Sequence, residues 1–409
     1  MKITVSTRVR SALLALVAGS TVANLYYAQP VLASLASSLD TSPSLAATVV
    51  VATLVGNGLA QLLLVPLADL VERRRLTQAL LAVQAAAMLV MAGCRDLTVA
   101  LTACVVIGLG GSAAMALLSY AASLSAPRER GRATGTVMSG VLLGILFSRS
   151  ISGFVSTMFS WRVTYLGGAA LAVAAALLLF LFPTSRNAEP PSGYTRLLAS
   201  VAGIVARDRF VQRRMAVGVL GFVSFNVLWT GLTLLLSGRA YGFSDRTIGL
   251  FGIIGLVGAL VARNAGSWFD RGHGARVSLF GWLGIAAAWA VSFVAGGGGG
   301  AGVVGVVATI ALLDAGMQAQ HITNQSALVA ARPAHTARVT TAYMSTTVFA
   351  GAVGSALAST LYAADGWNAL AVLGLACSTL ALLTLRTARS TAPTPESISR
   401  HTKETEPAT

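Results

Sequence analysis

The feature that most constrains this chain is a succession of long apolar segments. Apolar runs of about 17 residues or more recur along it, each long enough to cross the hydrocarbon core of a bilayer. A soluble protein of 409 residues could not bury so many such runs, and a composition of 55% hydrophobic and 11% charged residues indicates an integral membrane protein. The pattern predicts about twelve spans, at roughly 11–35, 46–68, 76–94, 97–122, 133–157, 161–182, 214–237, 247–268, 276–295, 301–330, 338–362 and 367–386.

The two halves of the chain repeat each other at a nearly constant offset. Gly19 and Asn24 in the first span recur as Gly221 and Asn226 in the seventh. Internal repeats of this kind are typical of secondary transporters, in which one bundle rocks against the other around a central site. The duplication therefore predicts an all-α membrane protein with twelve transmembrane helices in two pseudo-symmetric six-helix bundles. Further matched pairs are Asp69 with Asp270, Arg132 with Arg338, and Trp161 with Trp367.

Changes in composition divide the chain into four parts. We expect an N-terminal six-helix bundle over 1–182, a cytoplasmic linker over 183–213, a C-terminal six-helix bundle over 214–386 and a disordered cytoplasmic tail over 387–409. In the linker, arginines flank an apolar stretch over 197–205. This pattern fits an amphipathic helix on the inner leaflet, and a solvated linker explains it equally well.

Basic residues gather in alternate loops. If the N-terminus is cytoplasmic, that side of the membrane holds most of the 29 Lys and Arg residues. By the positive-inside rule, this asymmetry predicts a multi-pass protein of the bacterial inner (plasma) membrane with both termini cytoplasmic. It also accounts for the formal net charge of +15 without a nucleic-acid partner.

The sequence carries no motif for catalysis, for a nucleotide or for a metal. It has no Walker loop, and Cys94, Cys104 and Cys377 lack the spacing of a metal site. We therefore expect neither an enzyme nor a cofactor, and no ATP-driven pumping by this chain.

Two loop motifs, one in each half, combine an acidic residue with basic ones. They consist of Asp69 with Arg73 and Arg74 after the second span, and of Asp270 with Arg271 after the eighth. In these motifs, and in its glycine-rich fifth span, the chain resembles the major facilitator superfamily over nearly its whole length. The resemblance implies a carrier that works by alternating access, with the first and seventh spans lining a central cavity.

Two further segments, 24–30 and 314–325, are similar to the bacterial twelve-span drug and sugar efflux branch of that superfamily. Two features of its drug–proton antiporters are missing. The fifth-span proline is replaced in a region that contains Ser148-Arg149, and Cys104 lies near the place of the fourth-span arginine. These departures leave the substrate undefined.

The resemblance places the two loop motifs at a cytoplasmic gate. A carboxylate there pairs with basic groups or with a helix N-terminus when the inner side is closed, and opening breaks those pairs. A static topological anchor is the alternative. Gly140 and Gly144 in the fifth span are assigned to packing between the halves. The expected gate residues are Asp69, Arg73, Arg74, Asp270, Arg271, Arg132 and Arg338.

A polar stripe runs along the tenth span. Asp314, Gln318, His321 and Gln325 share one helical face, and an ionisable group at bilayer depth costs about 2.5–3.5 kcal/mol on insertion scales. We hypothesise that Asp314 and His321 exchange protons with a cavity, to which Gln318 and Gln325 also contribute. The alternative is a hydrogen-bonded seam that sets the helix register.

Arg149 in the fifth span is a further candidate for proton coupling or for binding an anionic group. Alternatively, its long side chain snorkels toward the outer headgroups.

Four polar or aromatic residues of the first and seventh spans, Asn24, Tyr27, Asn226 and Trp229, are candidates for lining the substrate cavity. Helix–helix hydrogen bonding is the rival explanation for the two asparagines.

Together these patterns predict a monomeric secondary transporter that exports a small molecule in exchange for protons, as an antiporter. Two alternatives stay open: an uptake carrier or facilitator of the same fold, and a membrane sensor that does not transport.

Overall fold

The computed structural model describes residues 7–126, 128–184 and 193–389, and within these ranges the chain forms helices and no strand. Ten helical stretches there are long and apolar enough to span a membrane. One of them, Asp245–Ala295, contains two antiparallel legs, and the shorter Val9–Ala23 begins the first span. The described helices thus agree with twelve spans. The predicted tail from residue 390 onward lies outside the described residues.

The first bundle contains helices that correspond to the six predicted N-terminal spans, with the first span broken after its first helix. These are α1 (Thr7–Ala23), η1 (Gln29–Val31), α2 (Leu32–Ser38), α3 (Pro43–Ala46), α4 (Thr48–Leu63), η2 (Pro66–Asp69), α5 (Arg73–Gly93), α6 (Leu97–Gly111), α7 (Ala113–Ser123), α8 (Arg130–Met158), α9 (Trp161–Leu178) and η3 (Leu179–Leu181).

A helix in the linker, α10 (Tyr194–Arg207), precedes the second bundle. It covers the apolar stretch of the linker and packs against helices of the second bundle and against η2. The second bundle contains α11 (Arg209–Ser237), α12 (Asp245–Leu250), η4 (Phe251–Gly255), α13 (Leu256–Trp268), η5 (Phe269–His273), α14 (Gly274–Ala295), α15 (Gly299–Ala331), η6 (Pro333–His335), α16 (Thr336–Asp365) and α17 (Trp367–Arg389).

Short polar side chains start several of these helices. A carboxylate or hydroxyl at the N-cap satisfies backbone N–H groups that have no partner within the helix. Glu72 caps α5, Asp96 caps α6, Ser160 caps α9 and Asp208 caps α11. Because such caps lie just before an apolar run, they set where each span begins.

Close packing within the first bundle depends on glycines in α8. A Cβ atom on Gly140 would lie 2.2 Å from the carbonyl oxygen of Ala15, and one on Gly144 would lie 2.1 Å from that of Gly19. The assignment of this glycine pair to packing between the halves was therefore wrong, since both glycines face α1. Gly153, later in α8, is the glycine that meets the second bundle, where its Cβ would lie 2.2 Å from the Asp245 carbonyl oxygen.

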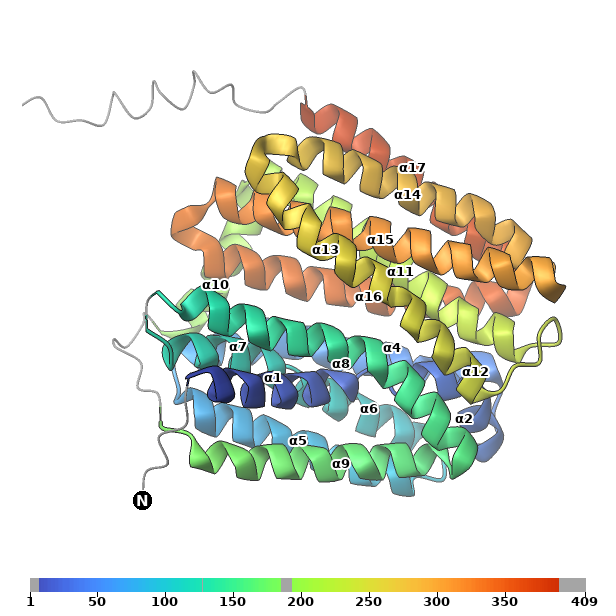
Figure 1. The fold of residues 1–409 in the computed structure, drawn as a ribbon, viewed down its shortest axis with the longest axis horizontal. Coiled ribbons are helices and arrows are strands. Elements are labelled where there is room, and N and C mark those ends of the chain that lie inside the picture. The colour runs from blue at the N-terminus through green and yellow to red at the C-terminus, as the bar shows by residue number, and fades with distance from the viewer. Residues whose placement is uncertain (1–6, 127, 185–192, 390–409) are drawn as a thin grey trace, which may run out of the picture.

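The two bundles lie side by side and meet along two seams, α4 with α16 and α8 with α12 and η4 (Figure 1). α10 and α12 lie at opposite ends of the pair of bundles (Figure 1). We call these the α10 end and the α12 end. At the α12 end α8 lies against α12, whereas toward the α10 end α8 and α13 diverge (Figure 1).

Candidate transport site between the two bundles

Two buried charges, one from each bundle, lie on either side of a tryptophan. Asp314 is in the middle of α15 and is 6% exposed, while Arg149 in α8 is 4% exposed. The indole Nε1–H of Trp229 donates to Asp314 Oδ1 over 3.3 Å. The guanidinium carbon of Arg149 lies 3.9 Å from the centroid of the Trp229 ring. Trp229 thus connects the carboxylate of one bundle to the cation of the other.

The side chain of Arg149 points into the protein. Its Nε donates to Gln29 Oε1 over 2.7 Å, and its guanidinium lies 5.2 Å from the centroid of the Tyr26 ring. Its Nη2 is buried with no hydrogen-bond partner among the described residues. The alternative of snorkelling toward the headgroups is therefore excluded.

Gln29 and Tyr26 were not expected in the site, because Tyr26, Gln29 and Pro30, on another face of the first span than Asn24, were interpreted as a kink and a packing contact. In the structure α1 ends at Ala23, and turns lead to η1, which starts at Gln29. This break presents Gln29 and Tyr26 to the fifth span. Pro30, whose ring fixes φ and which has no backbone N–H to donate, indicated the kink, but not that Gln29 would contact Arg149.

A glycine-rich 3₁₀ segment, η4, passes between the two charges. A Cβ atom on Gly255 would lie 2.7 Å from Asp314 Oδ2, and one on Gly252 would lie 3.0 Å from the Cβ of Arg149. Any larger residue at Gly255 would therefore press on the carboxylate. The charges of Arg149 and Asp314 interact electrostatically across this segment, which offsets part of the cost of burying each.

His321 lies in a separate aromatic cluster, two turns along α15 from Asp314. Its Nδ1 is 3.1 Å from the Tyr343 hydroxyl, the two rings stack with centroids 5.5 Å apart, and Phe222 meets it edge-on. Asn324 also donates to the Tyr343 hydroxyl, over 3.4 Å. His321 therefore has partners of the kind that the hydrogen-bonded seam requires.

The two glutamines of the α15 stripe are half-buried. Gln318 packs against α13, where a Cβ on Gly258 would lie 3.1 Å from its Cγ. Gln320 and Asn324, on another face of α15, are fully buried and were not singled out. Asn324 donates to the Arg214 carbonyl oxygen over 2.6 Å and so ties α15 to α11.

Three of the four cavity candidates in the first and seventh spans lie in packed surroundings. Asn24 donates to Gln84 Oε1 over 3.0 Å, which joins the break in the first span to α5. Tyr27 packs edge-on against Tyr165 with centroids 6.2 Å apart. Asn226 donates to the Phe222 carbonyl oxygen of its own helix. For Asn24 this geometry favours the rival explanation of helix–helix hydrogen bonding, whereas the hydrogen bond of Asn226 lies within α11 and does not support that explanation.

The residues expected in the gate lie at the α10 end. Arg132, Asp270 and Arg271 are exposed there. Arg74 donates to the Phe182 carbonyl oxygen over 2.8 Å and so links α5 to the end of the first bundle. Arg73 is the first residue of α5. Asp69 ends η2, and its side chain lies outside the described part of the structure.

Arg338 is half-buried and lines a cavity of about 350 Å³ between the bundles at the α10 end. Pro66 of η2 and Thr134 of α8 line it from the first bundle, and Val201 of α10 and Thr341 of α16 line it from the other side. The bundles are thus parted at this end, where the gate motifs lie.

At the α12 end, the carboxylate of Asp245, which was not among the predicted site residues, joins the bundles. Asp245, 7% exposed, accepts hydrogen bonds at Oδ2 from Ser34 of α2 and from Ser156 of α8, the latter over 2.7 Å. Ser150 donates to the Gly249 carbonyl oxygen over 2.9 Å at the same seam. Asp245 is the first residue of α12, so its sequence position suggested only a helix start.

The family model described as Major Facilitator Superfamily matches residues 14–355. The match covers most of the chain, and the two bundles that enclose the charged centre have the architecture expected of that family. The chain therefore belongs to the major facilitator superfamily, whose members are transporters and not enzymes.

Named relatives and a solved structure agree with this assignment. The uncharacterized transporter YgaY of Escherichia coli O157:H7 is 34% identical over 373 residues, which are 91% of this chain and 93% of that protein. Multidrug resistance protein D of Escherichia coli K12 is 26% identical over 259 residues, 63% of this chain and 64% of that protein. The nucleoside transporter NupG superposes with a TM-score of 0.73 over 94% of this chain and 99% of that one at 13% identity, which shows a common fold.

Proposed function

We propose that the chain is a proton-coupled exporter of a small organic molecule in the bacterial inner membrane, with Arg149, Trp229 and Asp314 at its transport site. The observation that carries the proposal is the meeting of two buried, oppositely charged side chains, one from each bundle, over a single aromatic ring. Ionisable groups at membrane depth are costly, and in transporters they mark substrate and proton pathways. The similarity to multidrug resistance protein D supports export.

The described conformation corresponds, in this proposal, to the inward-facing state. The contacts of Asp245 close the α12 end, and the cavity beside Arg338 opens the α10 end, which the basic loops predict to be cytoplasmic. When the α10 end closes, the acidic residues Asp69 and Asp270 form the pairs of the gate with arginines such as Arg132.

Asp314 carries the proton in the proposed cycle. A proton on this carboxylate removes its attraction to Arg149, so protonation changes the energy of the contact between the bundles. A ligand shifts a conformational equilibrium only when it binds the two states differently, and this contact supplies such a difference. A proton that enters from outside and binds Asp314 then favours release of the substrate to the outside. The carrier afterwards returns to the inward-facing state.

The walls of the site define a class of substrate. Trp229 and Tyr26 supply aromatic faces, which suit a partly apolar molecule. The Nη2 of Arg149, which has no partner among the described residues, can donate to a carboxylate or carbonyl oxygen of that molecule. We therefore propose an amphipathic substrate with a hydrogen-bond acceptor, held beside Arg149.

The decisive experiment measures substrate flux and proton flux together in proteoliposomes with an imposed pH gradient. Compounds with and without a carboxylate form the screen. We expect an outward-directed substrate flux coupled to opposite proton movement, and we expect Asp314→Asn to abolish the dependence on the pH gradient. Asp365→Asn is the matched control, because Asp365 is an exposed acidic residue at the end of α16.

Each other outcome selects a different function. Substrate flux without proton movement would indicate a facilitator and contradict the proton-coupled exporter. Proton movement in the same direction as the substrate would indicate an uptake carrier. Absence of flux for every compound, in protein that is folded and reconstituted, would favour a membrane sensor of the same fold.

A further inference from the structure

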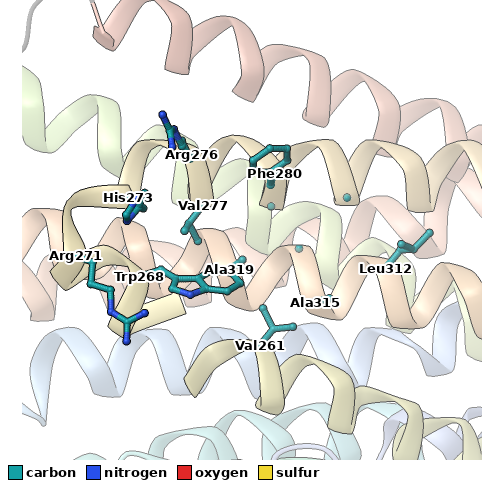
Figure 2. A pocket seen from close by; sticks show the side chains of 13 residues that line it. Val261, Trp268, Arg271, His273, Arg276, Val277, Phe280, Leu312, Ala315 and Ala319 are labelled. Carbon is teal, nitrogen blue, oxygen red and sulfur yellow. The ribbon is translucent and has the colours of Figure 1, made fainter. Parts of the chain in front are cut away.

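A second cavity lies on the side of the C-terminal bundle, away from the charged centre. It has a volume of about 550 Å³ and lies between α13 and α14, with α15 behind it (Figure 2). Its floor consists of small residues of α15, among them Ala315, Gly316 and Ala319. Apart from Arg271, which belongs to a gate motif, the residues that line this groove have no part in the proposed transport cycle.

The groove exists because α13 and α14 separate where the chain reverses direction. η5 makes the reversal, and Gly272 within it has a φ of +82°, a left-handed conformation that glycine adopts without strain. α13 and α14 each pack against α15 far more than against each other. The small side chains of α15 leave the space between them open.

The two ends of the groove differ in chemistry. Arg271, His273 and Arg276 gather at the end near η5, and Leu312 lies at the other end (Figure 2). The walls between are apolar and open to the surroundings: Trp268 is 48% exposed and Phe280 is 67% exposed. A ligand that fits this groove needs an anionic head and an apolar body.

We propose that the groove binds an anionic phospholipid from the leaflet that faces the α10 end. The headgroup phosphate contacts Arg271 and Arg276, and one acyl chain lies over α15 beside Phe280. Basic pockets between transmembrane helices bind anionic lipid headgroups, and η5 lies at the ends of two spans, at headgroup level. The occupant is a lipid because the groove opens sideways from a membrane-spanning bundle.

The headgroup provides the selectivity. Lipid tails are as apolar as leucine side chains, so an acyl chain gains little by moving from the bilayer into the groove. The arginines, in contrast, distinguish an anionic headgroup from a zwitterionic one. Asp270 is exposed, does not line the groove, and leaves two arginines and His273 facing the headgroup.

The test is native mass spectrometry of the purified full chain with dioleoylphosphatidylglycerol or with dioleoylphosphatidylcholine. The wild type is expected to retain phosphatidylglycerol in preference. Arg271→Gln/Arg276→Gln should lower that retention tenfold or more, because each basic residue near an anionic surface contributes about 1 kcal/mol, a factor of about five. Arg128→Gln/Arg130→Gln removes the same charge from exposed positions of the other bundle and should leave retention unchanged.

A second variant tests the apolar part of the groove with the arginines intact. Ala315→Phe places a ring in the groove from its floor and should also displace phosphatidylglycerol. Equal retention of the two lipids, equal loss in both double variants, or full retention by Ala315→Phe would overturn the proposal. Displacement by millimolar inorganic phosphate would do the same and would indicate a site for free anions. None of these readouts depends on transport.

Discussion

Two contacts join the bundles across the same seam, and they differ in kind. Within the spans, Arg149 of α8 and Asp314 of α15 contribute opposite charges that face each other across Trp229 and η4. At the α12 end, Asp245 accepts hydrogen bonds from neutral hydroxyls, including that of Ser156. Removing Arg149 is therefore expected to cost much stability, because it leaves a buried charge without its charged partner. Removing one hydroxyl beside Asp245 is expected to cost less, because another hydroxyl still donates to that carboxylate.

The largest expected effect concerns the charged centre. Arg149→Gln leaves Asp314 buried without its cation, and removing one partner of a buried charge pair typically destabilises a protein by about 3–5 kcal/mol. Thermal unfolding of the purified protein, followed by fluorescence, should show a marked loss of stability.

The double variant Arg149→Gln/Asp314→Asn checks the cause of that loss. It removes both charges, so most of the lost stability should return, although transport should not. If the double variant is as unstable as Arg149→Gln alone, the loss of stability does not come from an unpaired charge. The charged contact at Asp314 would then not differ in kind from the hydroxyl contact at Asp245.

An intermediate effect is expected where the bundles touch at the α12 end. Gly153→Ala places a Cβ atom 2.2 Å from the Asp245 carbonyl oxygen and forces the seam apart, at a cost of about 1–3 kcal/mol for overpacking. Electron-resonance distances between spin labels on the two bundles should show a shift toward conformations that are open at this end.

Gly135→Ala is the matched control in the same helix, since a Cβ atom there meets no atom within 4 Å. It should leave the distance distribution unchanged and slightly favour the helix. Identical distributions for the two variants would mean that close contact at Gly153 does not hold the α12 end closed.

The smallest effect is expected for one hydroxyl of the Asp245 cluster. Ser156→Ala removes a donor while the Ser34 hydroxyl remains, so the closed α12 end should lose about 1 kcal/mol and the same spin-label distances should shift modestly. Ser139→Ala is the control, because Ser139 is exposed on α8 and its hydroxyl donates to the Gly135 carbonyl oxygen of the same helix. If Ser156→Ala shifts the spin-label distances as much as Gly153→Ala does, the hydroxyl contact is as important for closing the α12 end as the close packing at Gly153.

The repeat in the sequence predicts the two bundles but not equivalent contacts at equivalent positions. Asn24 and Asn226 correspond in the repeat, yet Asn24 bonds to Gln84 of another helix and Asn226 bonds to its own helix. The positions agree because each half builds the same six helices. The partners differ because the break after Ala23 has no counterpart in α11, which is continuous.

The sequence singles out a candidate residue most readily where the chemistry belongs to that residue alone. Asp314 and Arg149 stood out in the sequence because an ionisable group inside an apolar span is costly wherever it points. Gln29 and Asp245 did not stand out, because a glutamine near a proline and an aspartate at a helix start are ordinary residues in such places. Their importance arises from segments far away in the chain.

The sequence alone determined the spans, the two-bundle architecture and the family, because apolar length and repetition are properties of consecutive residues. Only the tertiary structure decided that Arg149 turns inward onto Trp229 and that Asp245 joins α12 to α2 and α8. Helical periodicity assigns a residue to a face, but it does not say which helix that face meets. The contacts between helices depend on how the two bundles pack. α8 packs against α12 at the α12 end and is separated from α13 toward the α10 end.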